Sequence, residues 1–392
     1  MADYASLKSH FSRSLAGAGQ RIHLAAHSHH LWPDASYAGH MAAWDDAATR
    51  FDAKWSHVFA EVIPTAQRHI ARRLNLADPA AIAFAPNTHD FLRRLLSACP
   101  PRTPPRVLTT DGEFHTLTRQ LARLAQDGMV DVTTVPVRPF ATFQERFAHA
   151  AGGRFDLVFV SQVFFNAGWV VADLTALIDA VIDPYALVAI DGYHGFMARP
   201  TDLSRIQHRA FYLAGGYKYA MSGEGVCFMH CPPGYAPRPR DTGWYAGFGA
   251  LAAPTVGIAY GTDGSRFLGA TFDPSGLYRL NAVMAWLDLL GLEVAEIHAR
   301  ALAMQAAFLA AVDPIGIPGL CAADLVVPPG HTPRANFLAF DSPHAAALQV
   351  RLAEAGIVTD VRGSVLRVGF GLYHDMADMP AIAARIRDAA RG

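Results

Sequence analysis

The stretch YLAGGYKYAMSGEGVCF, residues 212–228, places a single lysine, Lys218, in a loop between two apolar runs. The chain has only two other lysines, Lys8 and Lys54, and arginine supplies the rest of its basic charge. Tyrosines flank Lys218, and glycines lie on both sides of it. Burial in such surroundings disfavours the ammonium form and lowers the pKa of the amine, which makes it a nucleophile toward carbonyl groups. The alternative interpretation of this stretch is an exposed loop lysine.

The run before Lys218 is one of seven short apolar runs that alternate with helical patterns. Stretches such as THDFLRRLLSAC and LTRQLARLAQDG have the spacing of amphipathic helices. This alternation is typical of an α/β fold, in which a mostly parallel sheet is covered by helices on both faces. The expected strands are residues 81–85, 106–111, 130–137, 156–163, 186–191, 210–215 and 225–231.

The pattern changes near Pro274. Residues 276–312 have a long helical pattern in which Gly291 is the expected break, and shorter strand and helix patterns follow to the end of the chain. We therefore expect a large domain over residues 61–273 and a smaller α+β domain over residues 274–392. The segment over residues 1–60, rich in His and Trp, is expected to pack on them and to contribute to the active site.

The composition excludes several classes of function. Hydrophobic residues make up 52% of the 392 residues and charged residues 17%, as in well-packed globular proteins. The net charge of −1 predicts neither a nucleic acid nor an anionic membrane as partner. No apolar run reaches the roughly 18 residues of a membrane-spanning helix, and the first residues lack the apolar segment of a secretory signal. Four scattered cysteines are too few for a disulfide framework, so a reduced, cytoplasmic setting is expected.

An aspartate, Asp191, ends the apolar run ALVAID, and His194 follows three residues later. The carboxyl ends of parallel strands form the edge at which such sheets bind ligands. A pyridoxal phosphate (PLP) site needs an aspartate that keeps the pyridine nitrogen protonated, which makes the ring an electron sink. The alternative is that Asp191 caps a turn and His194 is an ordinary hydrogen-bonded residue.

Two strand-to-helix turns add candidate cofactor ligands. In AFAPNTHDFLRRLL, either Asn87 or Thr88 caps a helix whose free N–H groups suit a phosphate. In TTDGEFHTLTRQ, His115 opens a helix, where a flat ring would lie on a cofactor. Taken alone, each turn is equally compatible with an ordinary helix start.

An arginine, Arg367, lies within the apolar strand pattern VLRVGF near the end of the chain. A buried guanidinium needs a carboxylate partner, and its forked geometry suits the carboxylate of an amino-acid substrate. An internal salt bridge is the alternative, and Arg362 is expected to be structural or peripheral.

Two groups of residues suggest a metal site. Cys227 and Cys231, with His230 between them, lie in one expected strand, where alternation puts both cysteines on the same face. No second ligand cluster follows them, so structural cysteines are expected. For the cluster HSHH, residues 27–30, we prefer a role in the substrate pocket, and no metal is expected.

The order of these features resembles the fold-type I PLP-dependent enzymes, specifically the aminotransferase class V group and, within it, kynureninase. The motifs AHSHHLWP (26–33), DGYHG (191–195), GGYKY (215–219), GWYAGF (243–248) and TDVRGSVLRVGFGLYHD (359–375) are similar to kynureninase motifs. The resemblance runs over nearly the whole chain.

The resemblance implies a role for each candidate. Lys218 would carry the cofactor covalently and move the α-proton, and Asp191 would pair with the pyridine nitrogen. Arg367 would hold the substrate carboxylate, with Ser28 close by and His27 in the place of the kynureninase asparagine. The remaining cofactor ligands would be Asn87, Thr88 and Tyr217 at the phosphate, His194 near the 3-oxygen or phosphate, His115 (or its neighbour Phe114) on the ring, and Thr271 at the phosphate of a neighbouring subunit.

The resemblance also implies a homodimeric PLP enzyme that acts on a small amino acid or amine. Because His27, AMSGEG (220–225) and GLY (371–373) depart from the kynureninase pattern on the substrate side, transamination is the favoured reaction. Kynureninase-like hydrolysis of a Cβ–Cγ bond is the first alternative, and a catalytically inactive binding protein is the second. A cysteine desulfurase needs a nucleophilic cysteine shortly before the substrate arginine, and no cysteine follows Cys321.

Overall fold

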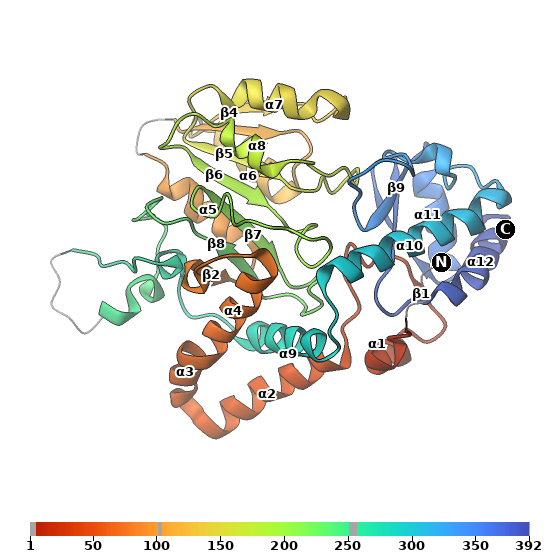
Figure 1. Cartoon of the computed structure of the whole chain (residues 1–392), viewed down its shortest axis with the longest axis horizontal. Coiled ribbons are helices and arrows are strands. Elements are labelled where there is room, and N and C mark those ends of the chain that lie inside the picture. Colours follow the sequence, from red (N-terminus) through yellow and green to blue (C-terminus); the bar gives the residue numbers. More distant parts are fainter. Residues whose placement is uncertain (1–4, 101–103, 251–256, 392) are drawn as a thin grey trace.

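A seven-stranded sheet forms the larger part of the fold, and all seven strands expected from the sequence are present (Figure 1). The computed structural model describes residues 5–100, 104–250 and 257–391. The strand order is β2-β8-β7-β6-β5-β3-β4, and β8 alone runs in the direction opposite to the other six strands. The strands are β2 (Ile82–Ala85), β3 (Arg106–Thr110), β4 (Asp131–Val135), β5 (Leu157–Ser161), β6 (Leu187–Asp191), β7 (Ala210–Gly215) and β8 (Cys227–His230).

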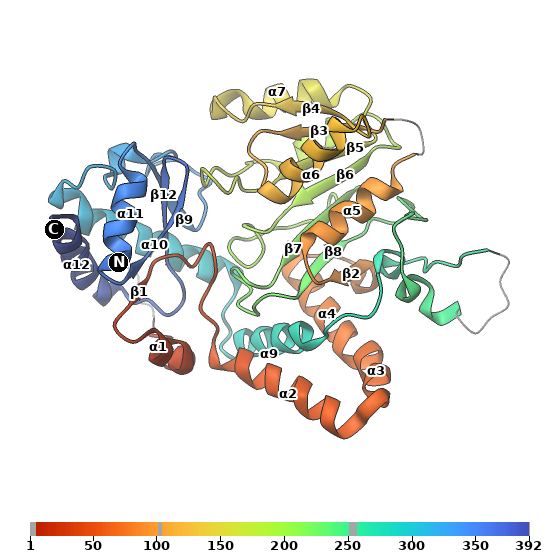
Figure 2. The same ribbon diagram turned by 180° about the vertical axis from the view of Figure 1, so that it is seen from behind.

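Helices cover both faces of this sheet, as the α/β pattern predicts. Side chains alternate across each strand, so that Phe159 of β5 packs with one set of helices and Val160 with the other. Figure 2 shows α5 (Thr88–Ala98) and α6 (His115–Gln126) on the first face. The opposite face carries α4 (Ile63–Leu74), α7 (Phe143–Ala151) and α8 (Leu174–Asp179). The central strands are therefore buried on both sides, which explains their nearly continuous apolar sequences.

A second, three-stranded antiparallel sheet lies in the C-terminal part of the chain, which confirms the expected α+β pattern there. Its order is β11-β12-β9, with β9 (Phe337–Asp341), β11 (Asp360–Arg362) and β12 (Val365–Gly369). Three helices pack around it: α10 (Val294–Val312), α11 (Ala345–Glu354) and α12 (Met379–Arg391). A short strand near the N-terminus, β1 (Ile22–His23), pairs in parallel with β10 (Ile357–Val358) beside it.

The helical pattern over residues 276–312 consists of two helices, α9 (Ser275–Leu289) and α10, and Gly291 lies in the break with a positive φ of 64°. Helix α9 packs against the long helix α2 (Asp34–Arg50). A Cβ at Gly39 of α2 would lie 2.6 Å from the Tyr278 carbonyl oxygen of α9, so only glycine permits this approach. The N-terminal part also contains α1 (Ser12–Ala18) and α3 (Lys54–His57).

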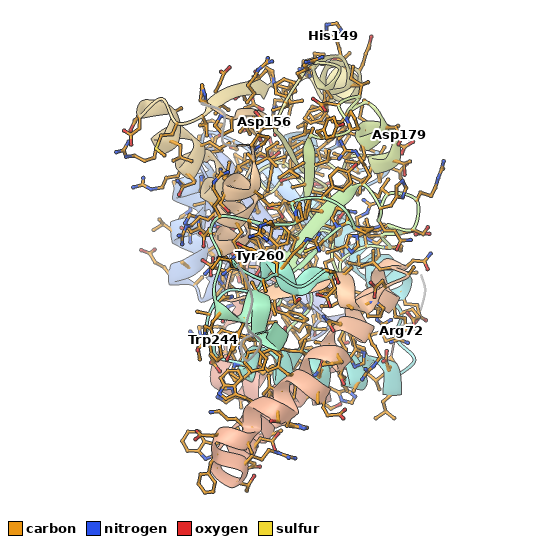
Figure 3. All side chains as sticks on the ribbon, turned by 90° about the vertical axis from the view of Figure 1, so that its left-hand side faces the viewer. Arg72, His149, Asp156, Asp179, Trp244 and Tyr260 are labelled. Atoms are coloured by element: carbon orange, nitrogen blue, oxygen red, sulfur yellow. The ribbon has the colours of Figure 1, made fainter. Side chains whose placement is uncertain are left out.

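Aromatic residues reach the surface in the segment between β8 and α9. The ring of Phe248 stacks on Phe59 at 4.8 Å, and 42% of Phe248 and 45% of Trp244 is exposed. Figure 3 faces this side of the molecule and shows Trp244 and Tyr260 on it. In the described part of the chain, no helix is long and apolar enough to cross a membrane.

Candidate active site

The amine of Lys218 is buried in the loop that follows β7. Only 6% of the residue is exposed, and its Nζ lies 2.9 Å from His194 Nε2. Three aromatic rings surround the nitrogen at 5.0 to 5.7 Å from their centroids: Tyr193, Tyr217 and Phe114. Burial, and secondly the charge of Arg367, lower the pKa of Lys218 to about 7. The interpretation of Lys218 as an exposed loop lysine is therefore wrong.

Glycines make this enclosure possible. A Cβ at Gly215 would lie 2.1 Å from the Tyr193 hydroxyl, and one at Gly216 would lie 2.3 Å from the Ser222 Oγ. Larger residues would push the tyrosine and the loop away from the lysine. The glycine-rich sequence around Lys218 therefore provides close packing rather than flexibility.

Asp191 lies at the carboxyl end of β6 and faces the same cavity as Lys218. Its Oδ1 accepts a hydrogen bond from the Tyr193 backbone N–H at 2.9 Å, and its other oxygen accepts none from a described residue. Burial raises the pKa of Asp191, and the nearby charge of Lys218 opposes that rise. A half-buried carboxylate with a free oxygen that faces a cavity suits a cationic or N–H-bearing ligand.

His194 lies against Lys218 with a neutral ring. Burial, followed by the charges of Lys218 and Arg367, keeps the pKa of His194 well below its usual range. Its Nε2 contacts the lysine, whereas its buried Nδ1 has no partner among the described residues. A Cβ at Gly195 would lie 1.9 Å from Gln162 Oε1, so the turn after Asp191 also depends on a glycine.

A cavity of about 210 Å³ opens above these residues. The N-terminus of α5 forms one side of it, where Asn87 Oδ1 accepts a hydrogen bond from the Asp90 N–H at 3.0 Å. Asn87 rather than Thr88 therefore caps the helix, and Thr88 lies on the cavity. The first N–H groups of a helix have no partner within it and attract anions. This end of the cavity suits a phosphate group.

Phe114, and not His115, lines the cavity. His115 begins α6, lies outside the cavity and contacts the Phe165 ring at 5.3 Å. Of the two residues considered for contact with a cofactor ring, only Phe114 lies where it could contact a ring in the cavity. Tyr217 also lines the cavity, with its ring between those of Tyr193 and His29, each at 4.8 Å.

Arg367 forms an internal ion pair. Its Nη2 donates to Asp360, its Nη1 donates to the Phe165 carbonyl oxygen at 2.5 Å, and its buried Nε has no described partner. Burial lowers the pKa of Arg367 to about 10. Arg362 donates to the other oxygen of Asp360. The internal salt bridge considered from the sequence is thus present, and Arg367 lies beside the cavity residues rather than among them.

His27 contacts the same ion pair. It is fully buried, its ring stacks on Phe337 at 4.8 Å, and its Nε2 lies 3.6 Å from Asp360 Oδ2. Burial keeps the pKa of His27 well below its usual range, so the ring is neutral. The Oγ of Ser28 lies 3.2 Å from His29 Nδ1.

The side chains of the cluster HSHH point to different partners, which argues against a shared metal ion. His27 faces Asp360, His29 stacks on Tyr217, and His30 Nδ1 contacts the Leu31 carbonyl oxygen at 2.7 Å. Within residues 5–100, 104–250 and 257–391, no group of three or more His, Cys, Asp and Glu is placed to hold a metal ion.

Cys227 and Cys231 share one face of the β8 segment, as predicted, and both belong to the core beneath α5 and α6. His230 points the other way and contacts the Gln207 carbonyl oxygen at 2.6 Å. The Sγ of Cys227 reaches the cavity and lies 3.6 Å from the Tyr193 hydroxyl. Burial raises the pKa of Cys227 to about 12, so the group is an uncharged thiol.

Several cavity residues were not singled out from the sequence. Ser161, Val163 and Phe165 lie at or just after the end of β5, and Tyr193 follows Asp191. The signal was available, because residues that follow buried parallel strands meet at one edge of the sheet. Thr271, by contrast, is exposed and lies just before α9, outside the cavity.

The cavity offers the groups that PLP requires. An amine of lowered pKa and a carboxylate with a free oxygen lie on its floor, a helix N-terminus lies at one end, and Phe114 forms a flat wall. The sequence profile of the family described as Aminotransferase class-V matches residues 40–380. The chain belongs to this family. It is accordingly a fold-type I enzyme of class V with PLP as cofactor.

Solved structures of a C-S lyase and of two cysteine desulfurases share the fold over 95% or more of this chain. The complex of the cystine C-S lyase C-DES with its product cysteine persulfide has a TM-score of 0.77 and 20% identity, with 95% of this chain and 99% of that chain covered. The apo cysteine desulfurase from Thermococcus onnurineus NA1 has a TM-score of 0.79 and 15% identity, with 100% of both chains covered. The cysteine desulfurase CsdA from Escherichia coli has a TM-score of 0.77 and 18% identity, with 98% of this chain and 97% of that chain covered.

At these identities the likeness concerns the fold. No curated protein matches this class V chain in sequence.

Proposed function

We propose that this class V enzyme removes the α-proton of an α-amino acid and transfers its amino group, as an aminotransferase. The observation that carries the proposal is Lys218, a buried amine whose pKa of about 7 leaves much of it unprotonated near neutral pH. Bound PLP supplies an electron sink that stabilises negative charge at the α-carbon. Lys218 is placed to hold the cofactor at rest and, once released, to accept the α-proton on Nζ.

The other cavity residues have assignable tasks under this proposal. Asp191, with its free carboxylate oxygen, would hold a proton on the pyridine nitrogen and so maintain the electron demand of the ring. The N-terminus of α5 with Asn87 and Thr88 would bind the phosphate, together with Tyr217, and Phe114 would contact the ring. His194, neutral and next to Lys218, would form a hydrogen bond on the side of the 3-oxygen.

The substrate carboxylate is assigned to the cluster around Arg367. The Nε of Arg367 is buried and unpaired within the described residues, and both ring nitrogens of His27 lack a hydrogen bond there. A carboxylate that enters between them would accept a hydrogen bond from Arg367 Nε and one from the N–H of the neutral His27 ring, and would share the arginine with Asp360. Ser28, at the start of the exposed part of HSHH, lies next to this position in the chain.

Elimination of a sulfur group from the β-carbon is a second candidate, favoured by the fold-wide likeness to a cystine C-S lyase. A desulfurase that forms a persulfide on its own cysteine is not favoured. Cys99, Cys227 and Cys231 are buried with pKa values raised to about 12, and Cys321 lies outside the cavity. Kynureninase-like hydrolysis is one alternative, and an inactive binding protein is another. An inactive protein would have no use for the placement of Lys218 and Asp191 in one cavity.

A homodimer with shared active sites forms part of the proposal. The exposed aromatic residues Trp244 and Phe248 and the exposed Ile258 lie in the segment that leads to Thr271. Clustered apolar side chains on a surface mark contacts with another protein. Under this proposal, a second copy binds this surface, and Thr271 of one subunit contacts the phosphate end of the cavity in the other.

Product analysis with loaded enzyme separates these reactions. The protein would be incubated with a panel of L-amino acids, cystine and kynurenine, without an added amino acceptor. Transamination predicts a 2-keto acid with the carbon skeleton of the donor and conversion of the cofactor to its amine form. Pyruvate with ammonia and a released sulfur product would replace the proposal by elimination, and alanine with an aromatic acid from kynurenine would replace it by hydrolysis.

A further inference from the structure

A buried carboxylate, Glu113, lies directly behind the cavity and has no task in the reaction described above. Only 3% of the residue is exposed, and no cation pairs with it among the described residues. Its Oε1 accepts hydrogen bonds from Thr110 Oγ1 at 2.7 Å and from the Ser161 N–H at 3.0 Å. Its Oε2 accepts one from Ser161 Oγ at 2.5 Å. Uncompensated carboxyl groups are rarely buried without a structural or functional reason.

These contacts connect two sides of the cofactor cavity. Glu113 immediately precedes Phe114, the aromatic wall, in the turn between β3 and α6. Ser161 ends β5, lines the cavity floor and is paired in register with Asp191 of β6. The turn is tightly packed, because a Cβ at Gly112 would lie 2.7 Å from the Phe164 ring. Glu113 is thus the side chain that joins the wall to the floor.

We propose that Glu113 is a positioning residue that fixes the distance between the Phe114 wall and the Ser161–Asp191 floor, and so sets how the cofactor ring is held. The inference rests on the placement of PLP in this cavity. The three hydrogen bonds that Glu113 accepts come from two hydroxyl groups and one backbone N–H, none of which carries a charge. Shape and hydrogen bonding, rather than ionic attraction, therefore hold the two sides together.

A neutral side chain of the same shape should be sufficient. In a Glu113→Gln variant, the amide oxygen accepts from Thr110 and from the Ser161 N–H, and the amide NH₂ donates to Ser161 Oγ, since a hydroxyl both donates and accepts. Burial raises the pKa of Glu113 to about 7, which agrees with a site that tolerates the uncharged form. A Glu113→Ala variant instead leaves three buried donors without an acceptor.

The test compares cofactor binding in matched variants of the full chain. PLP affinity is measured by absorbance titration, and ring orientation is followed by visible circular dichroism of the bound cofactor. Thr110→Val removes one contact with Glu113 and also the acceptor of the Gly112 N–H, whereas Thr109→Val makes the same change one residue earlier, where the buried hydroxyl has no described partner. We expect E113A to bind PLP at least about tenfold more weakly with an altered dichroism band. E113Q and T109V should retain the wild-type dichroism band. The PLP affinity of T110V should lie between that of these two variants and that of E113A.

Three results would overturn the proposal. E113A could bind PLP with the affinity and dichroism of the wild type, or E113Q could lose as much as E113A, which would make charge the active property. If E113A does not fold, a T110V variant with the same PLP affinity and dichroism as T109V would also overturn the proposal. A wild-type protein that takes up no PLP would refute the cofactor site itself, which separates that failure from a failure of the Glu113 role.

Discussion

Replacing Lys218 with methionine should make the cofactor-free protein more stable, although it removes the central residue of the site. The folded protein holds Lys218 at a pKa of about 7, whereas an unfolded lysine titrates near 10.5. The unfolded chain therefore binds more protons between these two values, and stability rises with pH across that window. The penalty for burying the charge is fully present below about pH 7 and is lost above about pH 10.5. At about 1.4 kcal/mol for each pH unit, its upper limit is about 5 kcal/mol.

The assay is urea unfolding of cofactor-free protein at pH 6 and at pH 10. Lys218→Met should exceed the wild type in free energy of unfolding by several kcal/mol at pH 6, and the difference should shrink by up to about 4 kcal/mol at pH 10. Lys54→Met is the matched control, because Lys54 is only partly buried and lies over the Trp55 ring at 5.9 Å. A Lys218→Met protein that is no more stable than the wild type at pH 6, or a difference independent of pH, would refute the claim that burial holds the pKa of this amine well below its usual value.

Three further predictions concern the cavity and the turns that form it. Gly192→Ala should destabilise the protein by about 3 kcal/mol or more in urea unfolding, because the new Cβ would lie 1.9 Å from the buried Tyr212 ring; unchanged stability would show that the turn after Asp191 is loose. Phe114→Ala should weaken PLP binding in an absorbance titration while His115→Ala leaves it within about twofold, and equal effects would contradict the assignment of the wall. Asn87→Ala should cost about 1 kcal/mol of stability through loss of the helix cap and should also weaken PLP binding, whereas a stability loss alone would remove this turn from the phosphate site.

The sequence predicted the sheet well because strand signals are local. Runs such as LVFVS and LVAID are apolar throughout, so they indicate strands buried on both faces, and helices between them require the parallel arrangement. Because β6 and β7 are parallel neighbours, their carboxyl ends lie side by side, which brings Asp191 and Lys218 to the same edge of the sheet. The short strands β1, β10 and β11 were not predicted, because two or three residues carry no detectable period.

Side-chain direction was the part that sequence could not supply. Phe114 and His115 are adjacent, and which of them faces the cavity depends on how the turn before α6 enters the helix. The pairing of Arg367 with Asp360 brings together strands β12 and β11 in a register that only the folded sheet defines. Glu113 appeared in the sequence only as part of a motif, because its partner Ser161 lies 48 residues away.

Covalent trapping would show directly whether this class V protein holds PLP on Lys218, as we propose. Purified protein is incubated with PLP, reduced with borohydride, digested and mapped by mass spectrometry. We expect one pyridoxyl group for each chain, on the peptide that contains Lys218. A protein that carries no adduct, or carries it on Lys8 or Lys54 instead, would show that Lys218 is not the attachment site.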